Sequence, residues 1–504
     1  MPRNLLPSFL AALTLGGVCA LAAAQQPPVK TAMNSPSFAW WAPDDGKTIT
    51  RQIDYFNDAG MLRTLLSGGP LDTKGHPFFS AQGSTGRACI TCHQPSDAMS
   101  LSAATAQARW DETNGKDPLF AAFDGSNCPI LPQADRASHS LLLDHGLIRI
   151  ERAWPPTDAA GRSVKPDFKL EVVRDPTGCN SGKFGPASHK VSVYRRPRPV
   201  TNLKYLLAAG FAYDPKKGMP LEIDPATGTP SNNNLLADAR AYSLEAQARD
   251  AMRSHLQMAG PLDEQKVKQI VAFELRLSTA QQIDAKAGSL DKDGAEGGPL
   301  KLEASQPGQL GSIGKAVWSE FEAWEKPPAS DTVSASAKAL RESIARGAKV
   351  FREKTFLISD SAGINSPIGF GNPVRNSCVF CHNMSQMGND VAPGQVDLGT
   401  TNLPFADPAP HLPLFKVTCL GAPHPHYGRT ILTHDPGFAL TTGRCADVGK
   451  ITLQSMRGLA ARAPYFSNGS ARTIRDVIDF YDRRYHIGYT DQEKKDLENL
   501  MKAL

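Results

Sequence analysis

Gly86-Arg87-Ala88-Cys89-Ile90-Thr91-Cys92-His93-Gln94-Pro95 contains the motif CxxCH at residues 89–93. Two thiols three positions apart can each form a thioether with a vinyl group of one haem, and the adjacent histidine can bind its iron. A single CxxCH is also compatible with a redox-active CxxC pair or with chance. The same pattern returns at Cys378-Val379-Phe380-Cys381-His382, and two copies favour a chain that carries two haem groups.

The cysteines and the histidine of each motif have separate predicted roles. The prediction is two covalently attached haem c groups, one on Cys89 and Cys92 and one on Cys378 and Cys381. The iron ligands would be His93 and His382.

The first 24 residues have the composition of a secretory signal peptide. A basic start is followed by an apolar run from Phe9 to Leu21, too short to span a membrane, and by Ala22-Ala23-Ala24. Because c-type haem is attached outside the cytoplasm, export predicts a bacterial periplasmic protein. Residues 25–45 are rich in Pro and Ala and predict an extended arm. No later stretch is long and apolar enough to cross a membrane.

The composition gives no indication of a nucleic-acid partner and predicts disulfide bonds. The formal net charge of +5 is spread along the chain, so nothing indicates a nucleic-acid-binding surface. Four cysteines remain beyond Cys19 and the motif cysteines. In an oxidising compartment they favour the disulfides Cys128–Cys179 and Cys419–Cys445. A zinc site is the alternative, but these cysteines lack CxxC spacing.

Apolar residues at helical spacing recur around both motifs, and the 504 residues exceed what one hydrophobic core usually holds. Helices are expected at 243–255, at 263–275 with Asp263 as N-cap, at 337–351, and at 491–501 with Thr490 as N-cap. The runs 147–150 and 169–173 have the composition of strands.

The predicted fold class is mostly α, with two cytochrome c-like haem domains in tandem and an irregular, partly β insertion in the N-terminal domain. The expected boundaries are 46–285 for the N-terminal domain with its insertion at 94–199, 286–332 for a linker and 333–504 for the C-terminal domain. Each haem would then lie between an opening and a closing helix.

Two further stretches resemble the bacterial di-haem cytochrome c peroxidases and their relatives of the MauG type. The stretch 455–481, which contains Ala463-Pro464-Tyr465-Phe466-Ser467-Asn468-Gly469-Ser470, looks like the family's LRN…APYFHDGS…TLxxVxxxY/M signature. The segment Ala239 to Ala248 is similar to its DGR…LxxQA segment. With both CxxCH motifs, the resemblance covers most of residues 50–504, except the insertion at 94–199.

The resemblance implies a division of labour between the two haem groups. The haem on His93 would bind peroxide, and the haem on His382 would transfer electrons. The sixth ligand of the second haem is a Met in the peroxidases and a Tyr in MauG-type enzymes, and that position falls here on Tyr481. The alternative for Tyr481 is a half-buried aromatic residue on an amphipathic helix. The rival ligands are Met456, Met384 and Met387.

The family places a Gln and, ten positions later, a Glu over the peroxide-binding iron. Gln247 fits the first position, but the second is Gln257, whose amide cannot accept and return a proton. His255 can titrate near neutral pH, and we expect it to share the distal pocket with Gln247; a packing or surface histidine is the alternative.

Two further positions depart from the family pattern. The family often has a Trp between the haem groups, where this chain has Leu236-Ala237, and it usually has a His where this chain has Ser467. An aromatic bridge between the haem groups must therefore use another residue, or their coupling must run through backbone and propionates.

The resemblance implies an oxidoreductase that reduces hydrogen peroxide to water with electrons from a small periplasmic cytochrome c or cupredoxin. In this family a Ca2+ ion often lies between the domains and many members are homodimers, although the sequence identifies no calcium ligands. Two other functions stay open. One is oxidation of a protein or organic substrate, as in MauG-type enzymes and oxygenases of the superfamily. The other is a non-enzymatic di-haem electron carrier in which Met99 or His76 closes the first iron.

Overall fold

The computed structural model describes residues 40–157, 162–208, 235–241, 243–305, 319–326, 333–365, 371–382 and 395–504. The predicted signal peptide, most of the predicted arm, and Met384 and Met387 lie outside the described residues. Within these ranges, no helix combines the length and apolar character that a membrane span needs.

Side-chain caps set the start of the main helices. α5 (Leu244–Ser254) follows Ser243, whose Oγ accepts a hydrogen bond from a backbone N–H of the first turn, and α6 (Glu264–Glu274) follows Asp263 in the same way. α8 (Ala335–Glu353) follows Ser334, and α11 (Asp491–Lys502) begins with a capping box between Thr490 and Glu493. These four helices confirm the predictions made from periodicity. The other α-helices of the described residues are α2 (Ala103–Thr113), α3 (Ser140–His145), α4 (Leu203–Ala208), α7 (Pro299–Ala304), α9 (Ala439–Thr442) and α10 (Ile474–Tyr485).

Strands in the described residues form six small antiparallel sheets. One sheet has the order β2 (Gln52–Asn57), β3 (Gly60–Leu66), β8 (Leu277–Asp284) and β9 (Gly288–Ser289). A second has the order β14 (Thr430–Thr433), β13 (Leu414–Cys419) and β6 (Phe168–Arg174). The remaining sheets pair β5 (Ile148–Ala153) with β7 (Lys190–Arg195), β1 (Thr48–Ile49) with β4 (Leu71–Asp72), β10 (Phe356–Ile358) with β11 (Val374–Asn376), and β12 (Gln395–Val396) with β15 (Ile451–Thr452).

The prediction of a mostly α fold built from two cytochrome c-like domains in tandem is wrong. Strands that precede and follow each CxxCH motif in the sequence form sheets, and two of these sheets join distant parts of the chain. β3 is buried along nearly its whole length and pairs with β8, where Thr64 and Thr279 are hydrogen-bonded across 215 positions. Helical periodicity is a local signal, whereas a strand is stabilised by a partner that the local sequence does not reveal.

The strands predicted at 147–150 and 169–173 are confirmed as parts of β5 and β6. β6 pairs along its length with β13, from Phe168 opposite Cys419 to Arg174 opposite Leu414. The segment 94–199 is thus hydrogen-bonded into the C-terminal half of the chain. The domain boundaries given above stay a prediction.

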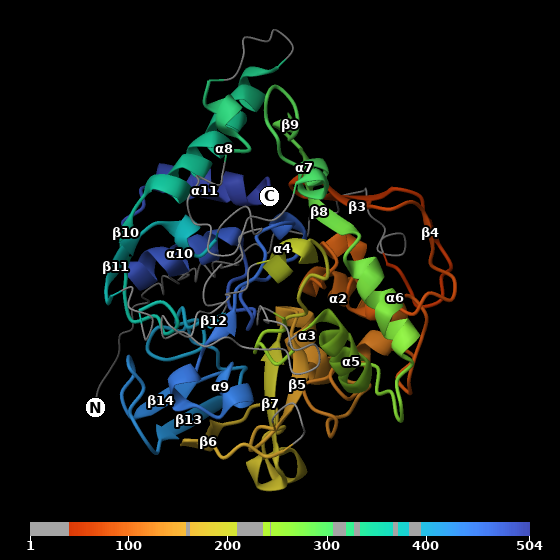
Figure 1. The fold of residues 1–504 in the computed structure, drawn as a ribbon, viewed down its shortest axis with the longest axis vertical. Helices are drawn as coiled ribbons and strands as arrows, with labels where there is room; N and C mark the ends of the chain where they lie inside the picture. Colours follow the sequence, from red (N-terminus) through yellow and green to blue (C-terminus); the bar gives the residue numbers. More distant parts are fainter. Residues whose placement is uncertain are drawn as a thin grey trace, which may run out of the picture.

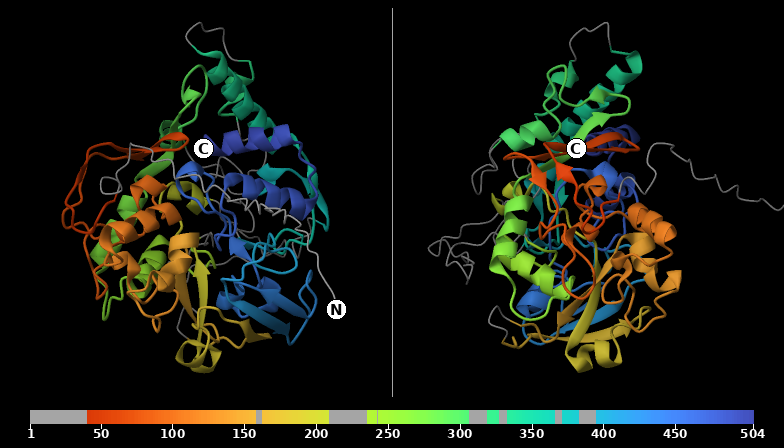
Figure 2. Two further views of the ribbon diagram at one scale, coloured as in Figure 1. Left: turned by 180° about the vertical axis from the view of Figure 1, so that it is seen from behind. Right: turned by 90° about the vertical axis from the view of Figure 1, so that its right-hand side faces the viewer.

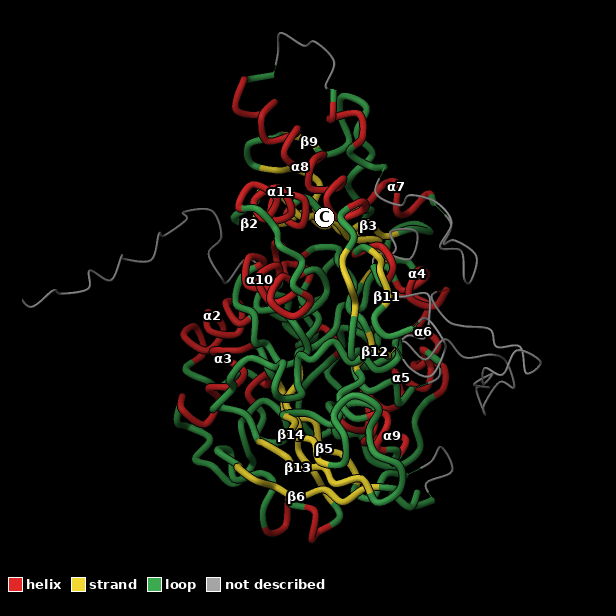
Figure 3. Tube along the Cα trace, turned by 90° about the vertical axis from the view of Figure 1, so that its left-hand side faces the viewer, coloured by secondary structure: helices red, strands yellow, loops and turns green. Residues whose placement is uncertain are grey.

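Two groups of elements lie at opposite ends of the molecule. In Figure 1, β5, β6, β7, β13 and β14 lie at the lower end, and α8 and α11 lie toward the upper end. The tube in Figure 3 shows β5, β6, β13 and β14 in yellow in its lower part, with α8 and α11 near the top, and the turned views in Figure 2 keep this arrangement. The chain therefore runs from one end to the other several times.

Both predicted disulfides are present. Cys128 and Cys179 are bonded with their Cα atoms 5.4 Å apart, and Cys419 and Cys445 are bonded with their Cα atoms 5.6 Å apart. The four motif cysteines form no disulfide.

α8 and α11 pack closely where Gly347 faces the backbone of Asp496. A Cβ atom on Gly347 would lie 2.2 Å from the carbonyl oxygen of Asp496, closer than side-chain atoms approach backbone. The Asp496 side chain accepts hydrogen bonds from Arg346 Nε at 2.9 Å and Nη2 at 3.0 Å, which ties the same two helices together.

Gly347→Ala should lower the free energy of unfolding by about 1–3 kcal/mol, because overpacking at this crossing outweighs the better helix propensity of alanine. Thermal or denaturant unfolding measures the change. Gly421→Ala is the matched control, since no atom lies within 4 Å of a Cβ there. Equal stability of the two variants would show that the helices do not meet at Gly347.

Candidate functional site

The first CxxCH motif borders a large cavity, which we call the N-terminal cavity. Cys89–Thr91 forms a short 3-10 turn, in which the backbone N–H of Ala88 donates to Thr91 Oγ1 at 3.1 Å. This turn places Cys89, Cys92 and His93 on one cavity of about 1200 Å³, including open solvent at its mouth. Its apolar walls come from β5, α4 and α5, through Ile148, Ile150, Leu203, Leu244, Ala248 and Ala251.

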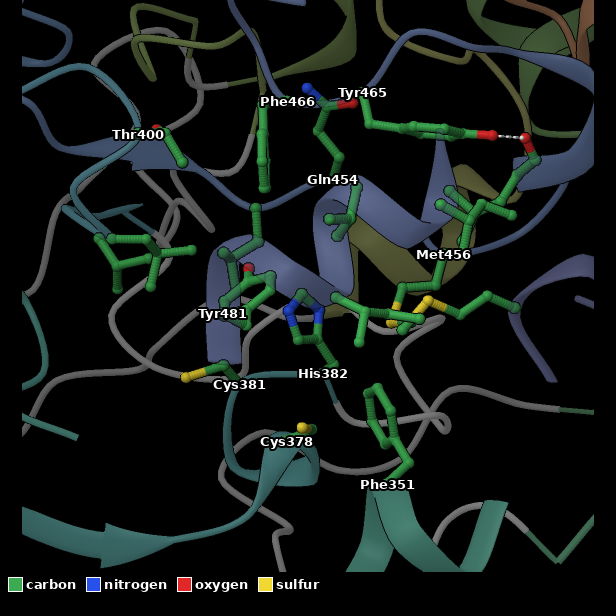
Figure 4. A pocket seen from close by; sticks show the side chains of 18 of the residues that line it. Phe351, Cys378, Cys381, His382, Thr400, Gln454, Met456, Tyr465, Phe466 and Tyr481 are labelled. Atoms are coloured by element: carbon green, nitrogen blue, oxygen red, sulfur yellow. Dashed lines mark hydrogen bonds between the residues drawn. The ribbon is translucent and has the colours of Figure 1, made fainter. Parts of the chain in front are cut away.

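The second motif borders a similar space, the C-terminal cavity, of about 1330 Å³ on the same measure. Cys378, Cys381 and His382 line it. Figure 4 shows these three residues on one side, with Gln454, Tyr465 and Phe466 on the opposite side. Its other apolar walls include Phe351, Phe356, Ile358, Val396, Ile478 and Leu497.

Burial controls the protonation of the motif residues. It raises the pKa of Cys92 to about 12 and that of Cys378 to about 11, so both are neutral thiols at pH 7. Burial also lowers the pKa of His93 to about 4, which keeps this imidazole neutral. His93 Nδ1 lies 3.1 Å from the Met99 carbonyl oxygen, which can only accept, so Nδ1 carries the proton and Nε2 keeps a lone pair.

Gln247 and His255 both line the N-terminal cavity, as expected for a shared distal pocket. Gln257 does not. Its amide nitrogen donates to the backbone oxygen of Ser254 at 2.5 Å, and its backbone has a left-handed φ of 55°. The position of the family's carboxylate is thus turned away from the cavity.

His255 is held by a carboxylate that the sequence did not reveal. Its Nδ1 lies 2.6 Å from Asp124 Oδ2, and Asp124 Oδ1 pairs with Arg87. Asp124 is 1% exposed. Burial by itself would raise the pKa of this carboxyl group, but Arg87 and His255 together outweigh burial, and the pKa lies below its usual value. An ionised carboxylate only accepts, so His255 donates from Nδ1, and in the neutral form of the ring Nε2 carries the lone pair.

Asp124 lies in the segment 94–199, separated from His255 by 131 positions, and no local pattern marks it. A second residue that the sequence did not reveal is Glu274, at the end of α6. It lines the N-terminal cavity, its Oε2 is buried without a hydrogen-bond partner among the described residues, and burial raises its pKa to about 8. Glu274 is therefore a neutral carboxylic acid at the wall of the cavity.

Candidate ligands for the second iron lie in the C-terminal cavity. Tyr481 on α10 and Met456 both line it (Figure 4). The rings of Tyr481 and His382 are 6.4 Å apart between centroids and nearly perpendicular, at 87°. In the N-terminal cavity, by contrast, neither Met99 nor His76 belongs to the lining.

The two cavities have the side chains that a c-type haem needs. Each cavity is lined by the two cysteines and the histidine of its CxxCH motif and by apolar side chains, and each encloses about 1200 Å³ or more of space including its open mouth. In the described ranges, no three His, Cys, Asp or Glu side chains are grouped to hold a metal ion, so the structure gives no ligands for the predicted Ca2+.

These features define a candidate c-type haem protein, and part of the chain is similar to curated cytochrome c peroxidases. It is 31% identical over 165 residues to cytochrome-c peroxidase IdrP2 of Denitromonas iodatirespirans, covering 30% of this chain and 42% of that protein. It is 31% identical over 148 residues to cytochrome-c peroxidase IdrP1 of Pseudomonas sp. (strain SCT), covering 26% of this chain and 37% of that protein.

The chain thus spans less than half the length of the curated relatives it matches. This similarity supports a distant relation to cytochrome c peroxidases; it does not extend to MauG-type enzymes. No protein-family model matches the chain. Among solved structures, hydrazine synthase of Kuenenia stuttgartiensis is matched with a TM-score of 0.29 and 15% identity, over 62% of this chain and 73% of that chain.

Proposed function

We propose that the chain is a periplasmic di-haem c-type peroxidase that reduces hydrogen peroxide to water. The observation that carries the proposal is the N-terminal cavity, where the CxxCH motif faces a histidine held by a buried carboxylate. In the described lining of this cavity, His255 is the one imidazole besides His93, and no methionine is present. A site with one proximal ligand and one oriented acid–base group suits peroxide cleavage.

In this proposal, Cys89 and Cys92 hold one haem and Cys378 and Cys381 hold the other. When bound, haem supplies an iron with an open coordination position for peroxide and stores the electrons for its reduction. His93 would be the proximal ligand, and the contact of its Nδ1 with the Met99 carbonyl oxygen favours the tautomer whose Nε2 can bind iron.

The distal residues of this chain move the proton. His255 Nε2 accepts the proton of the near peroxide oxygen and returns it to the far oxygen, which leaves as water. Asp124 keeps the ring oriented and stabilises its cationic form, and Gln247 offers an amide hydrogen bond to bound peroxide. Overall, one peroxide, two electrons and two protons give two waters.

The electrons enter through the C-terminal cavity. We infer a small periplasmic cytochrome c or cupredoxin as donor, and Tyr481 as the sixth ligand of the second iron. A phenolate ligand favours higher oxidation states than a thioether does. The presence of Tyr481 in the cavity therefore favours a second candidate function, the oxidation of a protein or organic substrate.

Haem counting and spin state test the proposal. The purified protein should carry two covalent haem c groups, and Cys89→Ala combined with Cys92→Ala should leave one. Electron paramagnetic resonance of the ferric protein should show one high-spin and one low-spin haem. Two low-spin haem groups that stay closed after one-electron reduction, with His255 as a second ligand of the first iron, would make the chain an electron carrier instead.

His255→Gln should lower peroxide turnover by about 100- to 10,000-fold, the usual contribution of a general acid–base group. Asp124→Asn should also lower peroxide turnover and shift the pH profile of turnover, because the imidazole of His255 loses its anionic partner. Stopped-flow kinetics with reduced cytochrome measures both effects. Asp117→Asn is the matched control, since Asp117 is equally buried, pairs with Arg109 and lies outside the cavity lining. Unchanged turnover in His255→Gln would exclude this base.

Tyr481→Phe should convert the second haem from six-coordinate low-spin to high-spin, while Met456→Leu leaves its spectrum unchanged. Tyr481→Met should raise its reduction potential, because a thioether stabilises the reduced iron. Visible and electron paramagnetic resonance spectra of the three variants measure these changes. The opposite pattern, with Met456→Leu altering the spectrum, would assign the ligand to Met456.

A further inference from the structure

The N-terminal and C-terminal cavities share a wall. Leu236 and Ala237 line the N-terminal cavity, and Thr452 lines the C-terminal cavity. The backbone N–H of Thr452 donates to the Ala237 carbonyl at 3.0 Å, and its Oγ1 donates to the Leu236 carbonyl at 2.6 Å. These hydrogen bonds lie where the family often has a Trp.

Arg198 crosses this wall. It lines the N-terminal cavity, but its guanidinium group donates to the carbonyls of Thr452 and, at 3.0 Å, of Leu453, both of which line the C-terminal cavity. Its Nε is buried and has no hydrogen-bond partner among the described residues. A buried donor without a partner is rare in native proteins, and a water or ion bound beside it is one of the explanations.

Two more arginines extend the positive charge to both sides. Arg196 lines the N-terminal cavity and donates to the carbonyls of Leu101 and Arg462 at 2.7 and 2.8 Å. Arg462 lines the C-terminal cavity and donates to the carbonyls of Arg457 and Ser455. We call Arg196, Arg198 and Arg462 the inter-cavity arginine cluster.

The cluster carries positive charge without a paired carboxylate. In the described part of the chain, none of its three guanidinium groups forms an ion pair within 4 Å, although Arg196 and Arg462 are only 5% and 4% exposed. Burial lowers the pKa of Arg196 and of Arg198 to about 9, and mutual repulsion adds to the effect. By contrast, neighbouring Arg195 and Arg240 are both paired with Asp238.

We propose that the inter-cavity arginine cluster binds carboxylate groups of the ligands in both cavities, with Arg198 serving both. Under the proposed function, on which this inference rests, these carboxylates are the propionates of the two haem groups. Buried guanidinium groups are costly unless an anion compensates them, and two cavities that meet at one cationic wall offer the place for it. The two haem groups then present their propionate edges to the shared wall, and one residue influences both irons.

Reduction potentials of the holoprotein test the inference. Arg198→Gln should lower the potentials of both haem groups, because an uncompensated propionate stabilises the ferric state. Arg196→Gln should lower only the first potential, and Arg462→Gln only the second. Arg198→Lys keeps the charge and should shift the potentials less. Arg341→Gln is the control, since this buried arginine pairs with Asp293 away from both cavities.

The outcomes separate the inference from the proposed function. Two haem groups with potentials that Arg198→Gln leaves unchanged would overturn the inference and leave the function standing. A protein without covalent haem would overturn both. Inorganic phosphate tests the alternative that the inter-cavity arginine cluster binds a free anion. If phosphate shifts the wild-type potentials but not those of Arg198→Gln, the cluster binds free anions and the propionate assignment is wrong.

Discussion

A network of buried ion pairs joins the two halves of the chain. Arg195 at the end of β7 donates to both carboxylate oxygens of Asp435, at 2.6 and 2.9 Å, and to Asp238 at 2.7 Å, and Asp238 also pairs with Arg240. Losing one partner of such a network leaves an uncompensated charge and costs about 3–5 kcal/mol. The network therefore holds the segment that lines the N-terminal cavity against the C-terminal half, and this makes the shared wall possible.

The segment 94–199, which the family resemblance does not cover, contributes residues to a sheet, to the N-terminal cavity and to the wall between the two cavities. It supplies strand β6 to a sheet with β13, Asp124 to the distal histidine, and Arg195, Arg196 and Arg198 to the interior between the cavities. Under the proposed function, the pair of Asp124 with His255 takes the place of the family's glutamate, and Arg198 lies at the wall where the family often has a Trp.

Charge is distributed unequally between the two cavities. The N-terminal cavity contains His255, Gln247, Glu274 and several guanidinium groups, whereas tyrosines and apolar residues dominate the C-terminal cavity. Proton transfer needs ionisable groups beside the reacting atoms, whereas an apolar shell around a redox centre limits solvent access and tunes its reduction potential. The asymmetry is consistent with the proposed division between a reactive site and an electron-transfer site.

The sequence alone determined both CxxCH motifs, the two disulfides and the capped helices α5, α6, α8 and α11, because each depends on residue identity or on spacing within a few turns. It also predicted Gln247 and His255 in one pocket, since both lie on or beside α5. Only the tertiary structure decided the antiparallel sheets, the Asp124–His255 contact, the turning away of Gln257 and the position of Arg198 between the cavities. The β3–β8 and β6–β13 strand pairs and the contacts of Asp124 with His255 and of Arg195 with Asp435 join residues more than a hundred positions apart, and no local pattern in the chain encodes which partner each one meets.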